Sequence, residues 1–292
     1  MTPPHLHPRA GLAPQPENGD FVRLPQGVTH YQVAGPDDAP LVVLVHGFSV
    51  PYFIWDPTFE FLTQSGFRVL RYDLLGRGFS ERPAVRYGID LFVTQLHSLL
   101  DALGWQQPVS VLGLSMGGPI SAAFTARHPQ RVARLGLIDP AGAAVVAFPW
   151  FLRLLSAAPG LGERLFTLVG EERLVQSIAS DFFDPALVAA FIERYRPQMQ
   201  YRGFVRAILS TMREGMVGDF SAVYRQVGAL GLPVLLLWGA HDATVPIAHS
   251  QILQAAIPQA QFHLIPRSGH IPHYERPEAV NPLLADFLSR GK

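Results

Sequence analysis

The sequence contains no cysteine, and this absence excludes several kinds of chemistry at once. A disulfide, a thiolate nucleophile and a cysteine-ligated metal site cannot form in this chain. The absence of cysteine does not indicate in which compartment the protein is found, because a chain without cysteine folds in either redox environment. Any nucleophilic catalysis must therefore use another side chain.

Excess charge of either sign is also missing. Lysine plus arginine and aspartate plus glutamate each number 23, so the formal net charge is zero, and only 16% of the residues are charged. Lys292 is the only lysine, and no run of basic residues indicates a nucleic-acid partner. We therefore expect a small-molecule substrate.

Long apolar runs are absent as well. Residues 1–9 lack the apolar segment of a secretory signal. The longest apolar stretch, about 141–152, contains Pro149 and is too short to cross a bilayer. We expect a cytoplasmic protein without stable membrane association, present as a monomer or homodimer.

Short apolar runs alternate with helical patterns along most of the chain. Near-continuous apolar runs are typical of strands in a parallel sheet that is covered on both faces, and the alternation predicts a three-layer α/β domain. The predicted strands are 28–33, 41–45, 68–72, 109–112, 135–138, 234–238 and 261–265. The predicted helices lie near 57–65, 89–103, 117–128, 247–256 and 277–290.

One segment interrupts this alternation. Residues 142–227 have helical patterns and no convincing strand, which predicts a helical cap. The core would then comprise 21–141 and 228–292, after a flexible tail at 1–20 that is rich in proline and polar residues. Aromatic residues of the cap are candidates for lining an acyl pocket or for packing the cap onto the core: Phe148, Trp150, Phe151, Phe166, Phe182, Phe183 and Phe191.

The most informative stretch is G-L-S-M-G from Gly113 to Gly117, with Ser115 at its centre. An apolar run precedes it and a helical pattern follows it, so we expect a tight strand–turn–helix connection. Glycine two positions to either side allows backbone angles that a side chain would obstruct. The turn aims the Ser115 hydroxyl and the first helical N–H groups at one spot, which predicts a nucleophile beside an oxyanion site.

A serine hydroxyl is a poor nucleophile at neutral pH, so a base must lie within hydrogen-bond reach. His270 is the best candidate, because it follows the last predicted strand, and loops at the carboxyl ends of parallel strands converge where Ser115 should emerge. His273 is a local alternative, which we expect to face the closing helix instead.

Asp242 is the best candidate for the acid that orients His270, since it follows a strongly apolar strand at the same sheet edge. A carboxylate there accepts the ring N–H, fixes the tautomer and stabilises the imidazolium. Asp139, after the preceding core strand, is the alternative acid. The chain order is then serine, aspartate, histidine.

The second half of the oxyanion site should come from the loop after strand 41–45. Gly47 allows the backbone to approach a substrate, and the N–H groups of Phe48 and Met116 are the predicted donors. We expect a structural role for His46. No H-E-x-x-H motif and no phosphate-binding loop occurs, so neither a catalytic metal nor a cofactor is expected.

Taken together, these motifs resemble those of the α/β-hydrolase fold superfamily. They are His46-Gly47-Phe48, residues 72–80, Gly113 to Gly118, Gly239 to Asp242, and Ser268-Gly269-His270. The resemblance runs from about residue 30 to 290 and is interrupted only by the cap. It implies a mostly parallel central sheet flanked by helices, a helical cap insertion, and a structural role for Asp73 and the turn 76–78.

Within that superfamily the chain looks most like the serine esterase, monoacylglycerol lipase and meta-cleavage-product hydrolase branch. This implies a carboxylesterase-like enzyme that cleaves esters of short to medium acyl chains through an acyl-enzyme. One alternative is a C–C bond hydrolase, although the loop after His46 has fewer glycines than is typical of that group. The others are a cofactor-free perhydrolase or haloperoxidase-like enzyme, and a non-catalytic ligand receptor on the same fold.

Overall fold

An eight-stranded sheet forms the centre of the computed structural model, which describes residues 16, 18–145, 156–157 and 160–290. The strand order is β1-β2-β4-β3-β5-β6-β7-β8. The pairs β1–β2 and β2–β4 are antiparallel, and the other neighbouring pairs are parallel. The strands are β1 (Asp20–Leu24), β2 (Gly27–Ala34), β3 (Leu41–Val45), β4 (Arg68–Tyr72), β5 (Val109–Leu114), β6 (Val132–Ile138), β7 (Val234–Gly239) and β8 (Gln261–Ile265). This confirms the α/β-hydrolase fold class that the sequence predicts.

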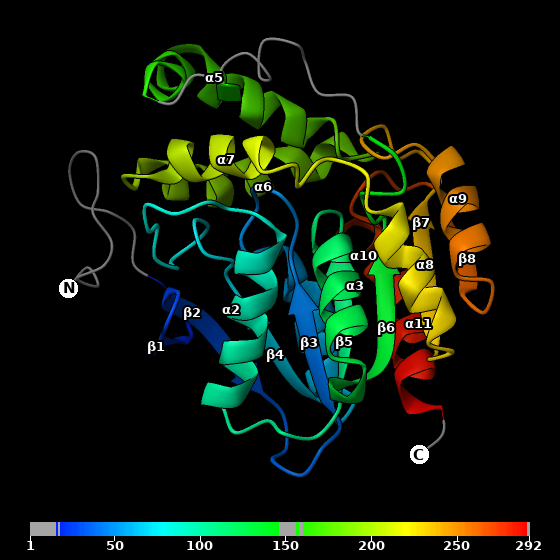
Figure 1. The fold of residues 1–292 in the computed structure, drawn as a ribbon. Helices are drawn as coiled ribbons and strands as arrows, with labels where there is room; N and C mark the ends of the chain where they lie inside the picture. The colour runs from blue at the N-terminus through cyan, green and yellow to red at the C-terminus, as the bar shows by residue number, and fades with distance from the viewer. Residues whose placement is uncertain (1–15, 17, 146–155, 158–159, 291–292) are drawn as a thin grey trace.

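Helices cover both faces of the sheet, as the near-continuous apolar strands require (Figure 1). Every residue of β3, β5 and β7 is buried. One face carries α2 (Ile89–Ala102), α3 (Gly117–Arg127), α8 (Ser221–Ala229) and α9 (Ala248–Ala256). The other face carries α1 (Asp56–Gln64), α10 (Pro272–Glu275) and α11 (Pro277–Ser289).

Three further helices lie over the edge of the sheet at which the parallel strands end (Figure 1). They are α5 (Leu161–Ala179), α6 (Val188–Tyr195) and α7 (Phe204–Arg213), and we call them the inserted helices. Ile178 of α5 and Ile208 of α7 are buried in the same apolar cluster as the α1 face of the sheet. The inserted helices are thus anchored to the core by apolar packing.

Two predicted boundaries lie close to described elements of the structure. The expected cap ends at 227, but α8 packs against α3 and α9 beside the sheet, so we propose that the cap ends before α8. The expected tail at 1–20 falls largely outside the described residues. Its last residues are placed, because the Asn18 carbonyl accepts a hydrogen bond from the Tyr52 hydroxyl, and β1 begins at Asp20.

Strand β1 is absent from the sequence prediction. Its five residues carry one buried side chain, Leu24, so they lack the apolar alternation that identifies a strand. It forms through its antiparallel ladder with β2. No helix in the described part of the chain is both long and apolar enough to cross a membrane.

Candidate active site

Ser115 lies at the apex of the turn between β5 and α3 with a φ of 53°, a conformation that non-glycine residues rarely adopt. The glycines around it are required by close approach rather than by unusual angles. A Cβ at Gly113 would lie 2.4 Å from the Gly117 carbonyl oxygen, and one at Gly117 would lie 2.3 Å from the Val45 carbonyl oxygen. The sequence therefore locates the turn correctly, but the backbone strain falls on the serine itself.

The structure brings together the serine, histidine and aspartate that the sequence singles out. His270 Nε2 lies 2.8 Å from Ser115 Oγ, and His270 Nδ1 lies 2.8 Å from Asp242 Oδ2. The other carboxylate oxygen of Asp242 accepts the backbone N–H groups of Thr244 and Val245, each at 2.8 Å. The loops that carry these three residues follow β5, β7 and β8, so the edge of the sheet positions all three side chains.

Burial and charge act in opposite directions on this histidine. Burial alone would lower the pKa of His270, but the charge and hydrogen bond of Asp242, followed by the charge of Asp181, raise it to about 9. Burial would raise the pKa of Asp242, yet the charge and hydrogen bond of His270 hold it below its ordinary value. The arrangement therefore stabilises an imidazolium beside a carboxylate, as general-base catalysis at a serine requires.

The loop after β3 runs directly against the serine. A Cβ at Gly47 would lie 3.3 Å from Ser115 Cβ, so a side chain at this position would crowd the serine. The cavity wall includes Phe48 from this loop and Met116, the N-cap residue of α3. Arg77 holds the loop in place, since its Nε donates to the Phe48 carbonyl at 2.8 Å.

Two other histidines near the site are buried and take part in packing. His46 Nε2 accepts the Leu74 N–H at 2.9 Å, and its Nδ1 lies 3.0 Å from the Gly47 carbonyl. Burial lowers the pKa of His46 to about 4. The His273 ring packs 4.4 Å from that of Trp55, and burial lowers its pKa to about 3. Both rings are thus neutral at neutral pH.

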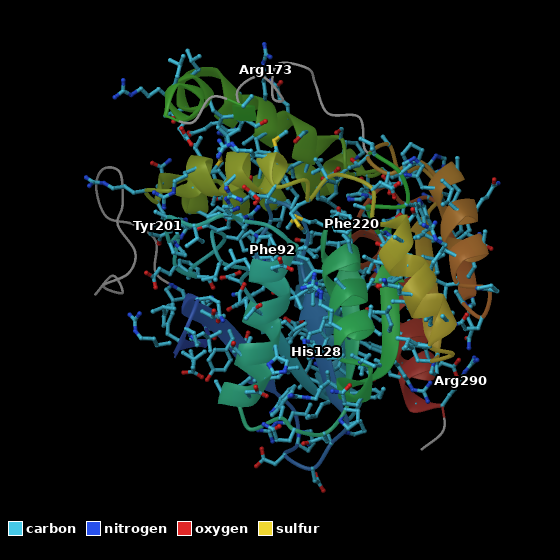
Figure 2. The ribbon with its side chains drawn as sticks, in the orientation of Figure 1. Phe92, His128, Arg173, Tyr201, Phe220 and Arg290 are labelled. Atoms are coloured by element: carbon cyan, nitrogen blue, oxygen red, sulfur yellow. The ribbon has the colours of Figure 1, made fainter. Side chains whose placement is uncertain are left out.

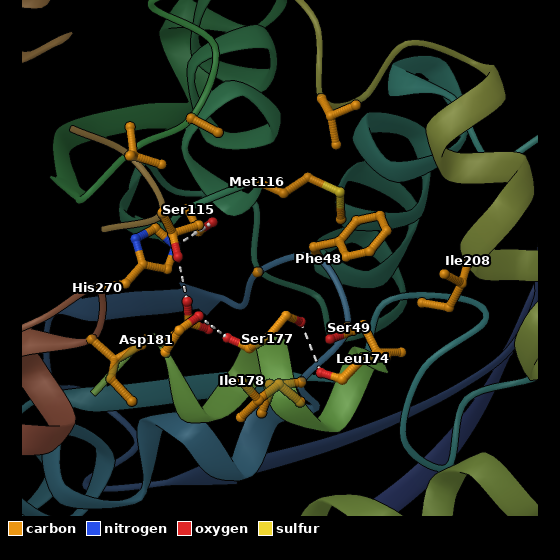
Figure 3. A pocket seen from close by; sticks show the side chains of 18 of the residues that line it. Phe48, Ser49, Ser115, Met116, Leu174, Ser177, Ile178, Asp181, Ile208 and His270 are labelled. Atoms are coloured by element: carbon orange, nitrogen blue, oxygen red, sulfur yellow. Dashed lines mark hydrogen bonds between the residues drawn. The ribbon is translucent and has the colours of Figure 1, made fainter. Parts of the chain in front are cut away.

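A cavity of about 310 Å³ opens beside Ser115 and His270 (Figure 3). Leu174, Ser177 and Ile178 of α5 point into it from the side opposite Phe48 (Figure 3). Its remaining wall is mostly apolar and includes Ile54, Leu114, Phe166, Ile208, Met212, Met216, Val245 and Ile271. Such a lining favours an apolar substrate group.

Among the cap aromatics, Phe166 lines this cavity. Phe182 and Phe191 instead pack edge to face, with ring centroids 5.0 Å apart, and Phe183 contacts His241. Phe148, Trp150 and Phe151 lie outside the described residues.

One acidic residue of the cavity wall is missing from the sequence prediction. Asp181, just after α5, accepts a 2.5 Å hydrogen bond from the Thr244 hydroxyl, and its backbone carbonyl accepts the backbone N–H of His270 at 2.7 Å. Burial raises the pKa of Asp181 to about 6, although His270 and Thr244 oppose this shift. A single aspartate after a helical pattern gives no sequence signal for such a role.

Glu275 is a second residue that sequence reasoning misses. Its buried carboxylate accepts the Gly269 N–H at 2.6 Å and the N–H groups of Phe183 and Asp184 at 2.7 and 2.9 Å. It therefore joins the loop that carries His270 to the segment after α5. This pairing bridges distant parts of the chain, so no local pattern reveals it.

Comparisons with known proteins agree with this geometry. A family model described as "alpha/beta hydrolase fold" matches residues 40–277. The chain belongs to the α/β-hydrolase family. A 2-hydroxymuconate semialdehyde hydrolase of Pseudomonas putida is 32% identical over 230 residues, which cover 77% of this chain and 78% of that protein. A monoacylglycerol lipase of Xenopus laevis is 24% identical, with coverage of 87% of this chain and 77% of that protein.

Solved structures show the same range of activities in their descriptions. The enol-lactonase of Burkholderia xenovorans LB400 has a TM-score of 0.78 and 25% identity, and the match covers 93% of this chain and 100% of that one. A thermophilic esterase of Thermogutta terrifontis has a TM-score of 0.77 and 25% identity, with coverage of 93% and 98%. Hydrolase chemistry is common to these relatives, whereas their substrates differ.

Proposed function

We propose that this hydrolase cleaves carboxylic esters of short to medium acyl chains through an acyl-enzyme. Ser115 attacks the carbonyl carbon while His270 accepts its proton, and Asp242 stabilises the imidazolium that results. The backbone N–H groups of Phe48 and Met116 stabilise the oxyanion. His270 then protonates the departing alcohol, and water repeats the sequence to release the acid. The observation that carries this proposal is the 2.8 Å contact on each side of the His270 ring.

The apolar wall of the cavity and the acidic side chain within it favour neutral esters. The cavity wall in the described part of the chain is mostly apolar, and its acidic member is Asp181, whose backbone carbonyl accepts the His270 N–H. A carboxylate on a substrate would be repelled by ionised Asp181 and would lose its hydration against the apolar wall. A neutral acyl chain meets neither cost.

C–C bond hydrolysis is the second candidate, and two observations favour it. A relative from Paraburkholderia xenovorans, 29% identical over 284 residues, is named as a hydrolase of 2-hydroxy-6-oxononadienedioate, which is an anion. Arg173 also belongs to the cavity wall, from a position on α5 at the outer side of the inserted helices (Figure 2). A guanidinium in the wall attracts an anionic substrate to the cavity.

A substrate profile separates the two candidates. We expect kcat/KM for p-nitrophenyl esters to rise with acyl length by up to about fourfold per methylene until the cavity is full, and then to fall. A 2-hydroxy-6-oxo-dienoate should be cleaved far more slowly than the best ester. Preference for the dienoate would favour the C–C hydrolase, and strong activation by triglyceride emulsions would contradict the proposed preference for short to medium acyl chains. Ser115→Ala is the control that separates enzymatic turnover from background hydrolysis.

A further inference from the structure

The alternative acid of the sequence analysis, Asp139, is held rigidly beside the site. It follows β6 directly, is 0% exposed, and has a φ of 42°, which non-glycine residues rarely adopt. Its backbone N–H donates to the Leu237 carbonyl at 3.0 Å, and its Oδ1 accepts the Gly239 N–H at 2.8 Å. These two bonds to β7 fix the direction in which the carboxyl group points.

The second carboxyl oxygen of Asp139 has no conventional partner. No N–H or O–H donor of the described residues reaches Oδ2, which is fully buried. The neighbouring group is the carboxyl group of Asp242. One carboxyl oxygen of Asp139, one of Asp242 and a ring nitrogen of His270 lie within 4.8 Å of one another. Two carboxyl oxygens can form a hydrogen bond only when one of them carries a proton.

The surroundings decide which carboxyl group is protonated. Asp242 has His270 and two backbone N–H groups to stabilise its charge. Asp139 has one backbone N–H, from Gly239. Like charges so close together in a buried site cannot both be retained at neutral pH, so the proton belongs on the carboxyl group with fewer donors.

We propose that Asp139 is a neutral carboxylic acid that donates a hydrogen bond to the Asp242 carboxylate and thereby acts as a positioning residue for His270. The inference rests on the proposed function only for its effect on turnover. The site would thus contain four side chains in one hydrogen-bonded chain, with Asp139 at the end opposite Ser115.

The charges around the pair agree with this assignment. Burial and then the charge of Asp242 raise the pKa of Asp139 well above its ordinary value, and Glu275 of α10 adds to the effect. The groups that face Asp242 are His270, Asp139 and, from the segment after α5, Asp181. The cation in this set is His270, whose Nδ1 forms its hydrogen bond with Asp242 and not with Asp139.

Infrared spectroscopy of the intact protein tests the protonation state without requiring turnover. At pH 8 the difference spectrum of wild type minus Asp139→Asn should contain the carbonyl band of a protonated carboxylic acid. At this pH Asp181, with a pKa of about 6, is ionised and does not contribute. A difference spectrum that contains only carboxylate bands would overturn the proposal.

Two variants test the positioning role. Asparagine at position 139 can still accept from Gly239 and donate to Asp242, whereas leucine can do neither. We expect kcat/KM to fall about threefold in Asp139→Asn and roughly 10- to 100-fold in Asp139→Leu. The downfield NMR signal of the proton between His270 and Asp242 should persist in the asparagine variant. Equal losses in both variants, or loss of that signal in Asp139→Asn, would contradict the proposal.

A bound cation is the other way to neutralise the pair, and chelation distinguishes it. Activity and the infrared band should be unchanged after dialysis against EDTA. Loss of activity that a divalent metal restores would assign the position to a metal ion instead. The infrared measurement does not depend on turnover, so it reports the protonation state of Asp139 even if esters are not substrates. Failure of the proposed function is therefore distinguishable from failure of this inference.

Discussion

The two walls of the cavity are built in different ways. On the sheet side, Ser115, Asp242 and His270 each follow a parallel strand directly and are linked at 2.8 Å. On the opposite side, α5 presents Leu174 and Ile178, whose apolar side chains offer a substrate packing contacts only. This contrast predicts that the sheet edge fixes the reactive geometry and that the inserted helices select the substrate. Variants on the sheet side should therefore affect all substrates, and variants on the other side should change their ranking.

The largest effect is expected from Ser115→Ala. Removal of the nucleophile closes the acyl-enzyme route, so kcat/KM should fall by roughly 10³- to 10⁶-fold for every ester. Alanine is small enough for the turn, and circular dichroism should show an unchanged fold. A variant that keeps more than about a tenth of wild-type kcat/KM would place the nucleophile elsewhere.

Asp242→Asn should rank next. Asparagine keeps the shape of the side chain but loses the charge that stabilises the imidazolium, so kcat should fall by up to about 10⁴-fold. Asp139→Asn is the matched comparison, and its loss should be far smaller. The reverse ranking, measured as kcat on one saturating ester, would show that the working acid follows β6.

Asp181→Asn should change the pH profile more than the maximal rate. His270 must be neutral to accept a proton, so kcat/KM should rise with pH toward its pKa of about 9. Asp181 is one of the charges that raise this pKa, so the variant should shift the rising limb to lower pH. It should also accept anionic esters about tenfold better relative to neutral ones.

Glu172→Gln is the matched control for that experiment, because Glu172 is an exposed residue of α5 paired with Arg196. An equal shift of the pH profile in both variants would mean that Asp181 has no local influence on His270. An unshifted profile in Asp181→Asn would show that the charge of Asp181 does not raise the pKa of His270.

The smallest effect on chemistry, but a measurable one on stability, is expected from Glu275→Gln. Its two carboxylate oxygens accept N–H groups from both walls, and glutamine supplies only one acceptor oxygen. One buried N–H is left unsatisfied, which costs about 1–3 kcal/mol of unfolding free energy. Urea denaturation should detect the loss, with Glu278→Gln, an exposed position in α11, as the control. Equal midpoints would show that Glu275 does not join the walls.

The sheet side is also the part of the site that the sequence could predict. Residues 113–117, Asp242 and His270 follow strands whose apolar runs are evident, and parallel strands end at one edge. The structure brings these residues together because the parallel strands that precede them end at the same edge of the sheet.

The opposite side could not be predicted in the same way. Asp181 meets the His270 loop, and Glu275 meets the segment after α5, through contacts between residues that are distant in the sequence. Helical patterns carry no information about which face covers the site. Asp139 shows the same limit at closer range. Its position after β6 marks it as an acid of interest, but the choice between Asp139 and Asp242 depends on which carboxyl group reaches His270.

Covalent labelling with a phosphonyl fluoride tests the central claim most directly, because such a reagent reacts with an activated serine. The account predicts one adduct, mapped by mass spectrometry to the tryptic peptide of residues 87–127 and absent in Ser115→Ala. The adduct should form far more slowly in Asp242→Asn. No adduct on folded wild-type protein, or an adduct that persists in Ser115→Ala, would contradict the account.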